Sequence, residues 1–562
     1  MTVVADSLVE QLERIADRLG SGAGVRVQLE RPRNPDHGDF ATNLALVLGG
    51  RLGRSPRDLA ADIVAALDLE RAGLAGAEIA GPGFINFRLA ADSLQARVAD
   101  IITADRAYGR RERAARHRIQ VEFVSANPTG PLHVAHGRGA ALGDAIAALL
   151  EHVGNDVQRE FYVNDAGVQI DRLAESLEAR WQELTGTPAS VPEGGYHGEY
   201  LREMAIGVEA EMGAVLRQLP RAERLRLLRD RATTLLRQEQ DRDLREFGVV
   251  FDEYYPESRL YEEGRIEETL RDLAEHGVTY ESDGAVWLRS SAFGDDKDRV
   301  LVKSDGTYTY FLPDIAYHRE KSRRGFDHVV DVWGADHHGY VPRMQAALRA
   351  LGMPDLLDVV IVQMVRLVRG GREVKLSKRA GDIVTLRDLI RETGPDVARY
   401  FFLMRRGDAQ MLFDLDLALD HSEKNPVYKV QYAHARMCSI FRKAGVERES
   451  VAGQADLSRL TAPSEQELIK QLGRYPEVVE RAADGRTPHM VCEYLEATAG
   501  LVNSWYHAGN PSRNPELAVL VPDTAVRDAR LCLARAVQIV LRNGLELLGL
   551  RAPEQMQREE SQ

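Results

Sequence analysis

At residues 131–138 the chain reads Pro131-Leu132-His133-Val134-Ala135-His136-Gly137-Arg138, at the point where a predicted strand gives way to a predicted helix. An apolar run, residues 119–124, precedes this segment, and an alanine-rich pattern of helical period, residues 139–153, follows it. A helix N-terminus offers free N–H groups and a partial positive charge, so it attracts anions. The imidazoles of His133 and His136 at such a position predict a site that holds a polyphosphate.

A second segment reads Lys375-Leu376-Ser377-Lys378-Arg379 and lies between Gly370-Gly371 and Gly381. The glycines favour a mobile loop, and its lysines would supply positive charge to a phosphoryl-type transition state. Alone, each segment has a simpler interpretation: a pair of capping or surface histidines, and a solvated basic turn. Their order and local contexts together resemble the HIGH and KMSKS signatures of class I aminoacyl-tRNA synthetases.

Length and composition are typical of a soluble globular protein. The 562 residues suffice for three or four domains, and no apolar run is long enough to span a membrane. Asp6 follows the first residues too closely for a signal peptide. The three cysteines, Cys438, Cys492 and Cys532, are sparse and lack zinc-ligand spacing. We therefore expect reduced thiols, a cytoplasmic location and no structural metal.

Net charge is −13, which argues against DNA or messenger RNA as a partner. The acidic excess lies in residues 1–420, whereas acidic and basic residues balance in residues 421–562. Local basic patches rather than totals make phosphate contacts, and two arginine clusters occur inside the acidic part. They comprise Arg110, Arg111, Arg113, Arg116 and Arg118, and then Arg217, Arg221, Arg224, Arg226, Arg229 and Arg231. The second cluster is equally well interpreted as a solvated helix face with i,i+4 ion pairs.

Residues 1–108 are predicted to form a small α+β unit. Apolar residues at helical spacing predict a helix near its start, and Phe40–Leu48 is predicted to be another helix. Val25–Leu29 and Ile85–Leu89 alternate as strands do. The basic stretch Arg110–Arg118 then reads as a linker.

Residues 118–395 are predicted to form an α/β domain with a doubly wound, Rossmann-like parallel sheet. A helical insertion rich in Leu and Arg, about residues 166–250, interrupts it. Ligands of such folds bind at the carboxyl ends of the strands, where the HIGH-like segment, residues 126–136, is placed. The predicted strands, which are apolar and β-branched, are Ile119–Val124, Gln158–Val163, His328–Trp333 and Leu356–Leu367.

Residues 396–562 are predicted to be helical throughout. Apolar residues at i, i+3 and i+4 indicate a bundle of packed helices, which closes with a run from Val521 to Leu548. The tail after Arg551 is polar and is expected to fray.

Five further segments make the chain similar, over nearly its whole length, to the arginyl-tRNA synthetase family. The fifth, in the N-terminal unit, is a feature of that family and not of class I synthetases in general. The segments are Ser125-Ala126-Asn127-Pro128-Thr129-Gly130, Phe161-Tyr162-Val163-Asn164-Asp165-Ala166-Gly167, Trp333-Gly334-Ala335-Asp336-His337-His338-Gly339, Asp396-Val397-Ala398-Arg399 and His37-Gly38-Asp39-Phe40-Ala41-Thr42-Asn43.

The resemblance implies that ATP activates L-arginine to arginyl-adenylate, which then passes to the 3′ end of tRNA(Arg). It assigns His133 and His136 to the ATP phosphates, and Lys378 with Lys375 to the developing charge. No protein nucleophile is needed, because positioning and charge stabilisation carry this chemistry. Mg²⁺ should accompany ATP without an all-protein cage. Further candidates for ATP are Gly130, Ala135, Gly334, Asp336 and Ser377, with Gly334 and Asp336 near the ribose.

One position departs from the family pattern. Ala135 stands where the family usually has glycine, which lets the adenine ring lie close to the backbone. A methyl group there puts ATP affinity in question more than the class of reaction.

The resemblance also implies an arginine site. Its guanidinium would meet Tyr310, Asp314 and Glu257, since a planar cation favours carboxylates in bidentate geometry. The α-amino end would meet Asn127, His337 and Glu122. Each has a simpler alternative: Asp314 could cap a helix beginning at Ile315, Glu257 could be a surface acid, Tyr310 a core residue and Asn127 a turn residue.

For tRNA, the resemblance implies that the N-terminal unit grips the elbow and the bundle reads the anticodon. Unstacked loop bases are met by aromatic and arginine side chains, which makes Tyr428, Tyr432, Arg436 and Trp505 candidates; core packing is the alternative for each. The family generally needs bound tRNA before it activates arginine, and we expect a monomer.

Two other functions remain open at this stage. A class I synthetase for glutamate or cysteine is disfavoured by the acidic pair and by the missing zinc-ligand cysteines. A non-catalytic tRNA-binding paralogue would usually have lost a signature histidine or lysine, and all four remain here.

Overall fold

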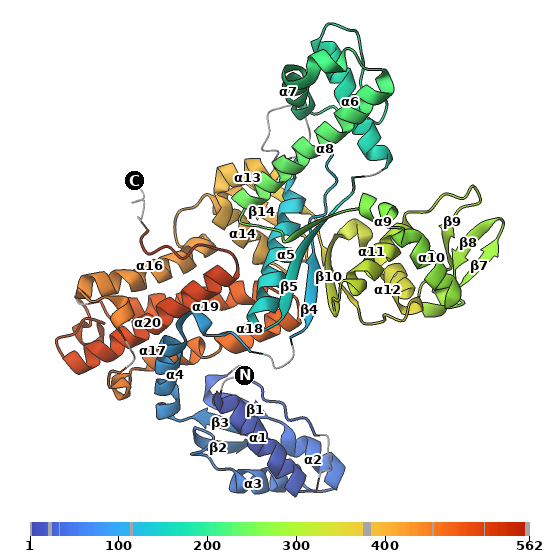
Figure 1. The fold of residues 1–562 in the computed structure, drawn as a ribbon. Coiled ribbons are helices and arrows are strands. Elements are labelled where there is room, and N and C mark those ends of the chain that lie inside the picture. The colour runs from blue at the N-terminus through green and yellow to red at the C-terminus, as the bar shows by residue number, and fades with distance from the viewer. Residues whose placement is uncertain are drawn as a thin grey trace.

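The computed structural model describes residues 3–20, 25–32, 34–112, 116–165, 167–374, 384–451, 454–510 and 512–556. Lys375, Ser377 and Lys378 therefore lie outside the described residues. Figure 1 shows a central sheet with the N-terminal unit at one end of the molecule and a helical insertion at the other. The helical bundle lies beside the sheet, on the side opposite a second, smaller sheet.

The central sheet of the described chain has five parallel strands in the order β11-β10-β4-β5-β6. The order reverses at β4, because β5 lies on one side of it and β10 on the other. Ligands of doubly wound sheets bind at the carboxyl ends of the strands beside such a reversal. The strands are β4 (Arg118–Glu122), β5 (Asp156–Val163), β6 (Glu253–Pro256), β10 (His328–Gly334) and β11 (Leu357–Val362).

Helix α5 (Val134–His152) follows β4 and packs against the sheet. It begins five residues before the predicted start at Gly139, so the HIGH-like histidines belong to its first turn. Gly143 permits the close approach, because a Cβ there would lie 2.2 Å from the ring of Phe123. The local sequence thus places the N-terminus of α5 at the carboxyl end of β4.

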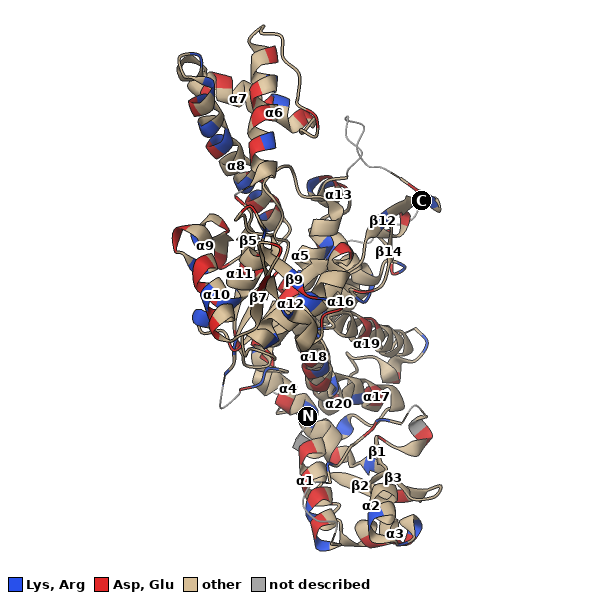
Figure 2. Cartoon of the chain, turned by 90° about the vertical axis from the view of Figure 1, so that its right-hand side faces the viewer, with Lys and Arg blue, Asp and Glu red and all other residues tan. Residues whose placement is uncertain are grey.

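The helical insertion consists of α6 (Val168–Leu184), α7 (Glu199–Leu216) and α8 (Arg221–Glu246), with its own apolar core. Figure 2 shows both signs of charge on these helices. The arginine cluster predicted here is ion-paired: Arg224 binds Glu178 at 2.8 Å and Arg231 binds Glu211 at 2.5 Å. The alternative interpretation is therefore wrong in its i,i+4 pairing, because the ion pairs of Arg217, Arg221, Arg224, Arg229 and Arg231 are made with acidic residues of α6 and α7.

A second sheet, absent from the predictions, follows the insertion. Its strands are antiparallel and pair in the order β7-β8-β9. It packs with helices into a separate core. The elements of this region are α9 (Ser258–Glu262), α10 (Arg265–Glu275), β7 (Thr279–Ser282), β8 (Ala285–Leu288), β9 (Arg299–Val302), α11 (Phe311–Arg323) and α12 (Val341–Ala350).

The N-terminal unit differs from its prediction at two points. Phe40–Leu48 was predicted as one helix, which is wrong at its start: Phe40–Thr42 is strand β1, which pairs with β3, and α2 begins at Leu44. The predicted strand Val25–Leu29 is also wrong, since only Glu30 bridges to Ala41. Pairing with β3 overrides local preference. The unit contains α1 (Val3–Arg18), β1 (Phe40–Thr42), α2 (Leu44–Leu52), α3 (Pro56–Ala66), β2 (Leu74–Ala80) and β3 (Phe84–Leu89).

The C-terminal part is a helical bundle joined by α4 (Ala91–Ala104) from the N-terminal unit. The prediction of helix throughout residues 396–562 is wrong at β14 (Met411–Asp414), which pairs in parallel with β12 (Val365–Arg369). The predicted strand Leu356–Leu367 is two strands, β11 and β12, because the chain leaves the central sheet between them. The remaining elements are β13 (Arg372–Glu373), α13 (Leu386–Thr393), α14 (Pro395–Leu403), α15 (Leu415–Ala418), α16 (Pro426–Ala444), α17 (Pro463–Leu472), α18 (Tyr475–Asp484), α19 (His489–Ala508) and α20 (Thr524–Leu547).

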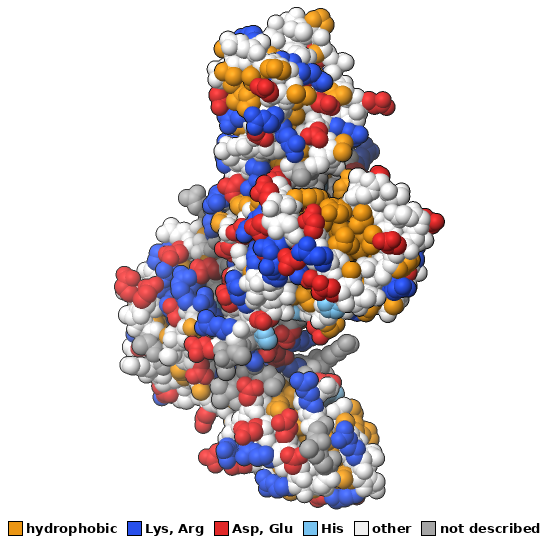
Figure 3. Space-filling view, turned by 45° about the vertical axis from the view of Figure 1, so that its right-hand side comes forward, with side chains coloured by type: hydrophobic (Ala, Val, Ile, Leu, Met, Phe, Trp, Pro, Cys, Tyr) orange, Lys and Arg blue, Asp and Glu red, His pale blue; other side chains and the backbone are white. Residues whose placement is uncertain are grey.

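Figure 3 shows acidic and basic side chains intermingled on one face of the molecule, with apolar side chains gathered over the insertion at the top. Leu184, Ile206 and Val215 are exposed there. Among the described helices, none is long and apolar enough to cross a membrane.

Candidate active site

A strained turn connects β4 to the HIGH-like segment. Val124 and Ser125 have φ values of 68° and 40°, a region that β-branched and other non-glycine residues rarely adopt. The Ser125 hydroxyl donates to Glu122 Oε1 at 2.8 Å and accepts from the Tyr162 N–H at 3.1 Å. The strain is held by these bonds between β4 and β5, as is common where a backbone must aim functional groups.

The residues after this turn are fixed by the insertion. Asn127 donates from Nδ2 to Gln169 Oε1 at 2.6 Å. Gln240, on α8 and buried, donates to the carbonyls of Asn127 and Gly130 at 3.2 and 3.1 Å. The insertion thus supports the segment that carries Asn127 and Gly130.

His133 and His136 are stacked at the start of α5. His133 is the N-cap, its backbone N–H donates to His136 Nδ1 at 3.3 Å, and the ring centroids are 3.7 Å apart. Burial lowers the pKa of both rings, and together with His133 it lowers the pKa of His136 to about 3. At neutral pH both imidazoles are therefore uncharged, so they offer hydrogen bonds to a phosphate while positive charge must come from elsewhere.

The described chain resumes beside these histidines after residues 375–383. The Val134 N–H donates to the Val384 carbonyl at 3.2 Å, and the Leu386 N–H donates to the Leu132 carbonyl at 2.8 Å. Gly137 allows this approach, since a Cβ there would lie 2.6 Å from the Leu386 side chain. The chain that is bound to the HIGH-like segment thus begins at Val384, five residues after the end of the KMSKS-like segment, residues 375–379.

Glu257 and Asp314 form a pair of interacting carboxylates. Glu257 follows β6 directly and Asp314 lies in the first turn of α11. Burial, with Asp314 and Asp165 nearby, raises the pKa of Glu257 to about 7. Burial also raises the pKa of Asp314, whose Oδ2 accepts from the Tyr340 hydroxyl at 2.6 Å. Among the described residues, neither carboxylate is ion-paired with a lysine or an arginine.

The alternative interpretation of Asp314 is wrong. It required a helix that begins at Ile315, whereas α11 begins at Phe311 and its N-cap is Tyr310. Glu257 is half-buried and not an ordinary surface acid.

Tyrosines other than the predicted one adjoin these carboxylates. Tyr310 is 84% exposed, whereas the phenol groups of Tyr162 and Tyr261 act on the pKa of Glu257 and the hydroxyl of Tyr340 binds Asp314. The sequence signals for Tyr162 are its position at the end of a predicted strand and its place in the family-like segment that begins at Phe161.

The segment after β10 carries the candidates for ribose and for the α-amino group. His337 and Asp336 are 59% and 82% exposed at their side chains and lie 3.5 Å apart. These side chains are open to solvent at the carboxyl end of β10.

Glu122 belongs to a buried ion network that the sequence did not reveal. The Lys321 ammonium, fully buried, lies 2.6 Å from Glu122 Oε2 and 2.9 Å from Asp331 Oδ1. His318 bonds Asp331 at 2.8 Å and, through its other ring nitrogen, the Asp314 carbonyl at 2.8 Å. Glu122 therefore already has a cation, and the network fixes the backbone that carries Asp314.

The bundle candidates differ in accessibility. Trp505 is 2% exposed and fits the core-packing alternative, and Tyr432 is 8% exposed. Tyr428 is partly exposed. The Arg436 guanidinium lies 4.8 Å from the Tyr506 ring centroid and pairs with Glu423 at 3.2 Å.

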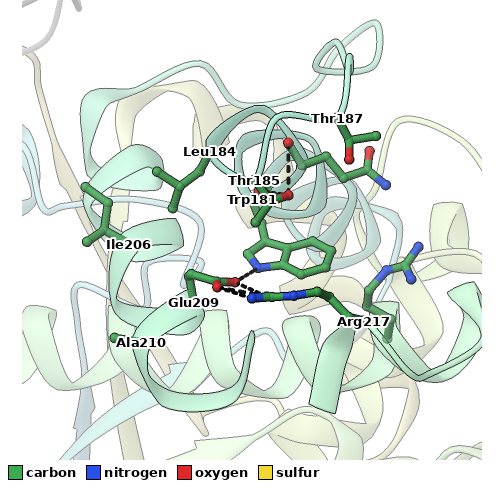
Figure 4. Close-up of a pocket in the computed structure, with 10 residues that line it drawn as sticks. Trp181, Leu184, Thr185, Thr187, Ile206, Glu209, Ala210 and Arg217 are labelled. Atoms are coloured by element: carbon green, nitrogen blue, oxygen red, sulfur yellow. Dashed lines mark hydrogen bonds and ion pairs between the residues drawn. The ribbon is translucent and has the colours of Figure 1, made fainter. Parts of the chain in front are cut away.

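A large cavity, about 780 Å³, lies in the helical insertion away from these residues. Figure 4 shows the Trp181 indole at its centre, bonded to Glu209, which Arg217 also binds. None of the predicted site residues lines it, and Glu209 and Arg217 neutralise each other. Among the described residues no group of three or more potential metal ligands occurs.

The reversed parallel sheet, with two histidines at the helix that follows its first strand, defines the catalytic domain of a class I aminoacyl-tRNA synthetase. The family model "tRNA synthetases class I (R), catalytic domain" matches residues 97–401. The models for the arginyl-tRNA synthetase N-terminal domain and the DALR anticodon binding domain match residues 3–89 and 430–556. The chain belongs to the arginyl-tRNA synthetase family.

Individual relatives agree with this assignment. The chain is 47% identical to an arginine–tRNA ligase of Geobacillus kaustophilus, over 98% of this chain and 99% of that protein. It is 48% identical to that of Syntrophotalea carbinolica, over 96% of each. Its fold is similar to the Thermus thermophilus arginyl-tRNA synthetase, with a TM-score of 0.74 at 24% identity, over 98% of this chain and 100% of that one.

The predicted family and fold class are therefore confirmed, and the chain is an enzyme, an aminoacyl-tRNA ligase. The class I synthetase family in general depends on ATP and Mg²⁺.

Proposed function

We propose that this chain activates L-arginine with ATP and transfers the arginyl group to the 3′ end of tRNA(Arg), using the residues described above. One observation carries the proposal: Glu257 and Asp314, two interacting carboxylates whose pKa values are raised, lie on segments of the same catalytic unit as the HIGH-like segment. A guanidinium between them would supply a positive charge that both carboxylates can bind, and its planar fork matches their geometry. Tyr340, which donates to Asp314, orients this pair better than the exposed Tyr310 does.

In the first step the arginine carboxylate attacks the α-phosphate of ATP and pyrophosphate leaves. His133 and His136, as neutral hydrogen-bonding groups, hold the phosphates at the N-terminus of α5, and Lys378 with Lys375 and Mg²⁺ balances the charge on the leaving pyrophosphate. Ser377, Gly130, Ala135, Gly334 and Asp336 complete the nucleotide site.

In the second step the terminal ribose hydroxyl of tRNA attacks the arginyl carbonyl and AMP leaves. The α-amino group of arginine is held by Asn127 and His337. Glu122 acts indirectly, because its carboxylate is already bound by the buried Lys321 ammonium, which it shares with Asp331. The protein supplies orientation and charge, and no covalent protein intermediate forms.

Specificity follows from the same pair. Citrulline is neutral and would leave two buried carboxylates unpaired, and lysine lacks the planar fork that can bind both. Sites of this kind reject analogues strongly, so the insertion at residues 166–250 need not proofread.

The tRNA contacts are assigned by family resemblance and by accessibility. The N-terminal unit would grip the elbow, and the partly exposed Tyr428 and Arg436 would meet anticodon bases, whereas Tyr432 and Trp505 are buried. We further propose a cytoplasmic monomer, which a mass measurement in solution tests.

Pyrophosphate exchange with each amino acid, with and without total tRNA, tests the function. We expect exchange with arginine only when tRNA is present. Exchange driven by glutamate, or by no amino acid, would overturn the proposal.

A variant pair tests the loop assignment. Lys378→Ala should slow activation by about 100-fold or more, since it removes transition-state charge, and should leave tRNA affinity nearly unchanged. Lys303→Ala, an exposed lysine beside the second sheet, is the control. Equal rates in both variants would remove Lys378 from its role.

A further inference from the structure

The segment Asp396-Val397-Ala398-Arg399 has no part in the reaction proposed above, although both of its charged residues are engaged. It lies in α14, the helix that enters the bundle. Arg399 is 1% exposed, so its guanidinium is desolvated and must be matched by fixed partners.

Both residues hold the turn that ends α20. Arg399 Nε donates to the Leu548 carbonyl, the C-cap of α20, at 2.6 Å. Asp396 accepts from Arg551 Nε at 2.8 Å. Gly549 has φ +71°, and a Cβ there would lie 2.5 Å from the Arg399 guanidinium. The guanidinium thus satisfies an orphan carbonyl at the negative end of the helix dipole, and the chain turns around it.

The same guanidinium also binds α5. Its Nη2 is ion-paired with Asp144 Oδ2. Asp144 Oδ1 in turn accepts from Arg159 Nε of β5 at 2.9 Å, and Arg159 pairs with Glu151 of α5 at 2.7 Å. One side chain therefore connects the last helix of the bundle, the catalytic helix and the central sheet.

Helix α5 carries His133 and His136 at its N-terminus, and at the usual rise per residue His136 lies about 12 Å from Asp144 along the helix axis. Near that N-terminus α5 is fixed by Arg138, fully buried, which donates to the carbonyls of Gln363, Arg406 and Ala409. The Asp144 contact is thus a second anchor, and it adds a buried ion pair to the packing of α5 on the bundle helices α14, α18 and α20.

We propose that Arg399 is a positioning residue for amino-acid activation. By binding Asp144 and the Leu548 carbonyl together, it sets the placement of His133 and His136 relative to the bundle. The proposal rests on the function proposed above, because its readout is arginine activation in the presence of tRNA.

Arg399→Lys tests the proposal. A lysine ammonium group can bind either Asp144 or the Leu548 carbonyl, but it lacks the planar guanidinium geometry that binds both at once. The expected result is a fall in kcat for activation of about 10- to 100-fold, the size that small misplacements cause. KM for ATP and Kd for tRNA should each stay within about threefold, a split that positioning rather than binding produces.

Arg530→Lys is the matched control. Arg530 is likewise a buried bundle arginine, paired with Glu465 at 2.7 Å and donating to the carbonyls of Glu516 and Ala518, but these partners are all in the bundle. Chemical unfolding measures the stability of each variant, and rates are compared per folded molecule. A loss of kcat in Arg530→Lys equal to that in Arg399→Lys would overturn the proposal.

The partner residue gives an independent arm. Asp144→Asn should lower kcat in the same direction, and Arg399→Lys combined with Asp144→Asn should be little worse than Arg399→Lys alone, since one contact is lost twice. Fully additive losses would refute the junction. Absence of arginine-dependent exchange in the unmodified protein would refute the proposed function instead, which separates the two failures.

Discussion

The helical insertion and the proposed arginine site both contain charged side chains that are withdrawn from water, but the charges are paired in the first and unpaired in the second. In the insertion, Glu178 is 3% exposed and binds two arginines, Arg221 and Arg224, at 3.0 and 2.8 Å. In the site, Glu257 and Asp314 face each other's charge, and their pKa values rise. In the insertion, the paired charges maintain the fold. In the proposed arginine site, the two carboxylates without a cation lower the stability of the folded protein, and a bound cation would remove that cost.

The largest effect should come from Asp314→Asn. The variant keeps the shape of the side chain but removes one of the two charges that face the substrate cation. Truncating one side of a desolvated charge contact costs about 3 kcal/mol, so kcat/KM for arginine should fall by about 100-fold or more. Steady-state exchange kinetics measure this, and the unfolding midpoint should stay the same or rise.

The insertion should respond in the opposite way to the same chemical change. Glu178→Gln leaves Arg224 without a counter-charge and should lower the free energy of unfolding by about 2 kcal/mol. Its kcat/KM for arginine per folded molecule should be unchanged. If Glu178→Gln damages catalysis as much as Asp314→Asn, the contrast between the two regions is false.

Which elements can be predicted from the sequence depends on whether neighbouring residues or distant partners determine their structure. The strand β4, the turn and helix α5 were predictable because an apolar run and a helical pattern specify them locally. The strands β7 to β9 were missed because each has four residues, and their identity depends on pairing with one another. Phe40–Thr42 became a strand for the same reason.

Within the site, the functional residues are easier to predict from the sequence than the side chains that contact them. Asp314 and Glu257 follow from family resemblance. The buried Lys321 does not, because its segment, Arg319-Glu320-Lys321, looks like an exposed helix face. Only the tertiary structure shows that Lys321 lies between Glu122 and Asp331, which are far from each other in sequence.

The next effect is a pH dependence that belongs to the site alone. The pKa of Glu257 is about 7, above its ordinary value of 4.5, so the carboxyl group is protonated below that pH. Because the substrate guanidinium binds the ionised form, kcat/KM for arginine should fall about tenfold per unit below pH 7. Saturating arginine should shift this profile to lower pH, since bound cation favours ionisation.

The same titration of Glu257 lowers the free energy of unfolding as pH rises, although it raises the activity. A carboxyl group whose pKa is raised on folding favours the folded state below its ordinary pKa, and that contribution is lost as pH rises through about 7. Glu257→Gln should therefore raise the free energy of unfolding at pH 8 by about 1 kcal/mol, allowing for solvent screening. A variant less stable at pH 8, or one whose residual activity keeps the acid limb, would contradict the assignment.

The smallest effect is expected where ATP would bind, at the first turn of α5, because neither a paired nor an unpaired charge determines the affinity for ATP there. His133 and His136 are neutral there, so the fit of the ATP base depends on shape, and Ala135 is partly exposed in the first turn of α5. Ala135→Gly removes one methyl group, which should lower KM for ATP by about two- to fivefold while kcat stays similar.

Glycine also costs about 1 kcal/mol of helix stability, so the unfolding midpoint should fall slightly. Ala140→Gly, a buried position further along α5, controls for that cost. A collapse of kcat in Ala135→Gly but not in Ala140→Gly would mean that the methyl group supports the ATP site instead of crowding it.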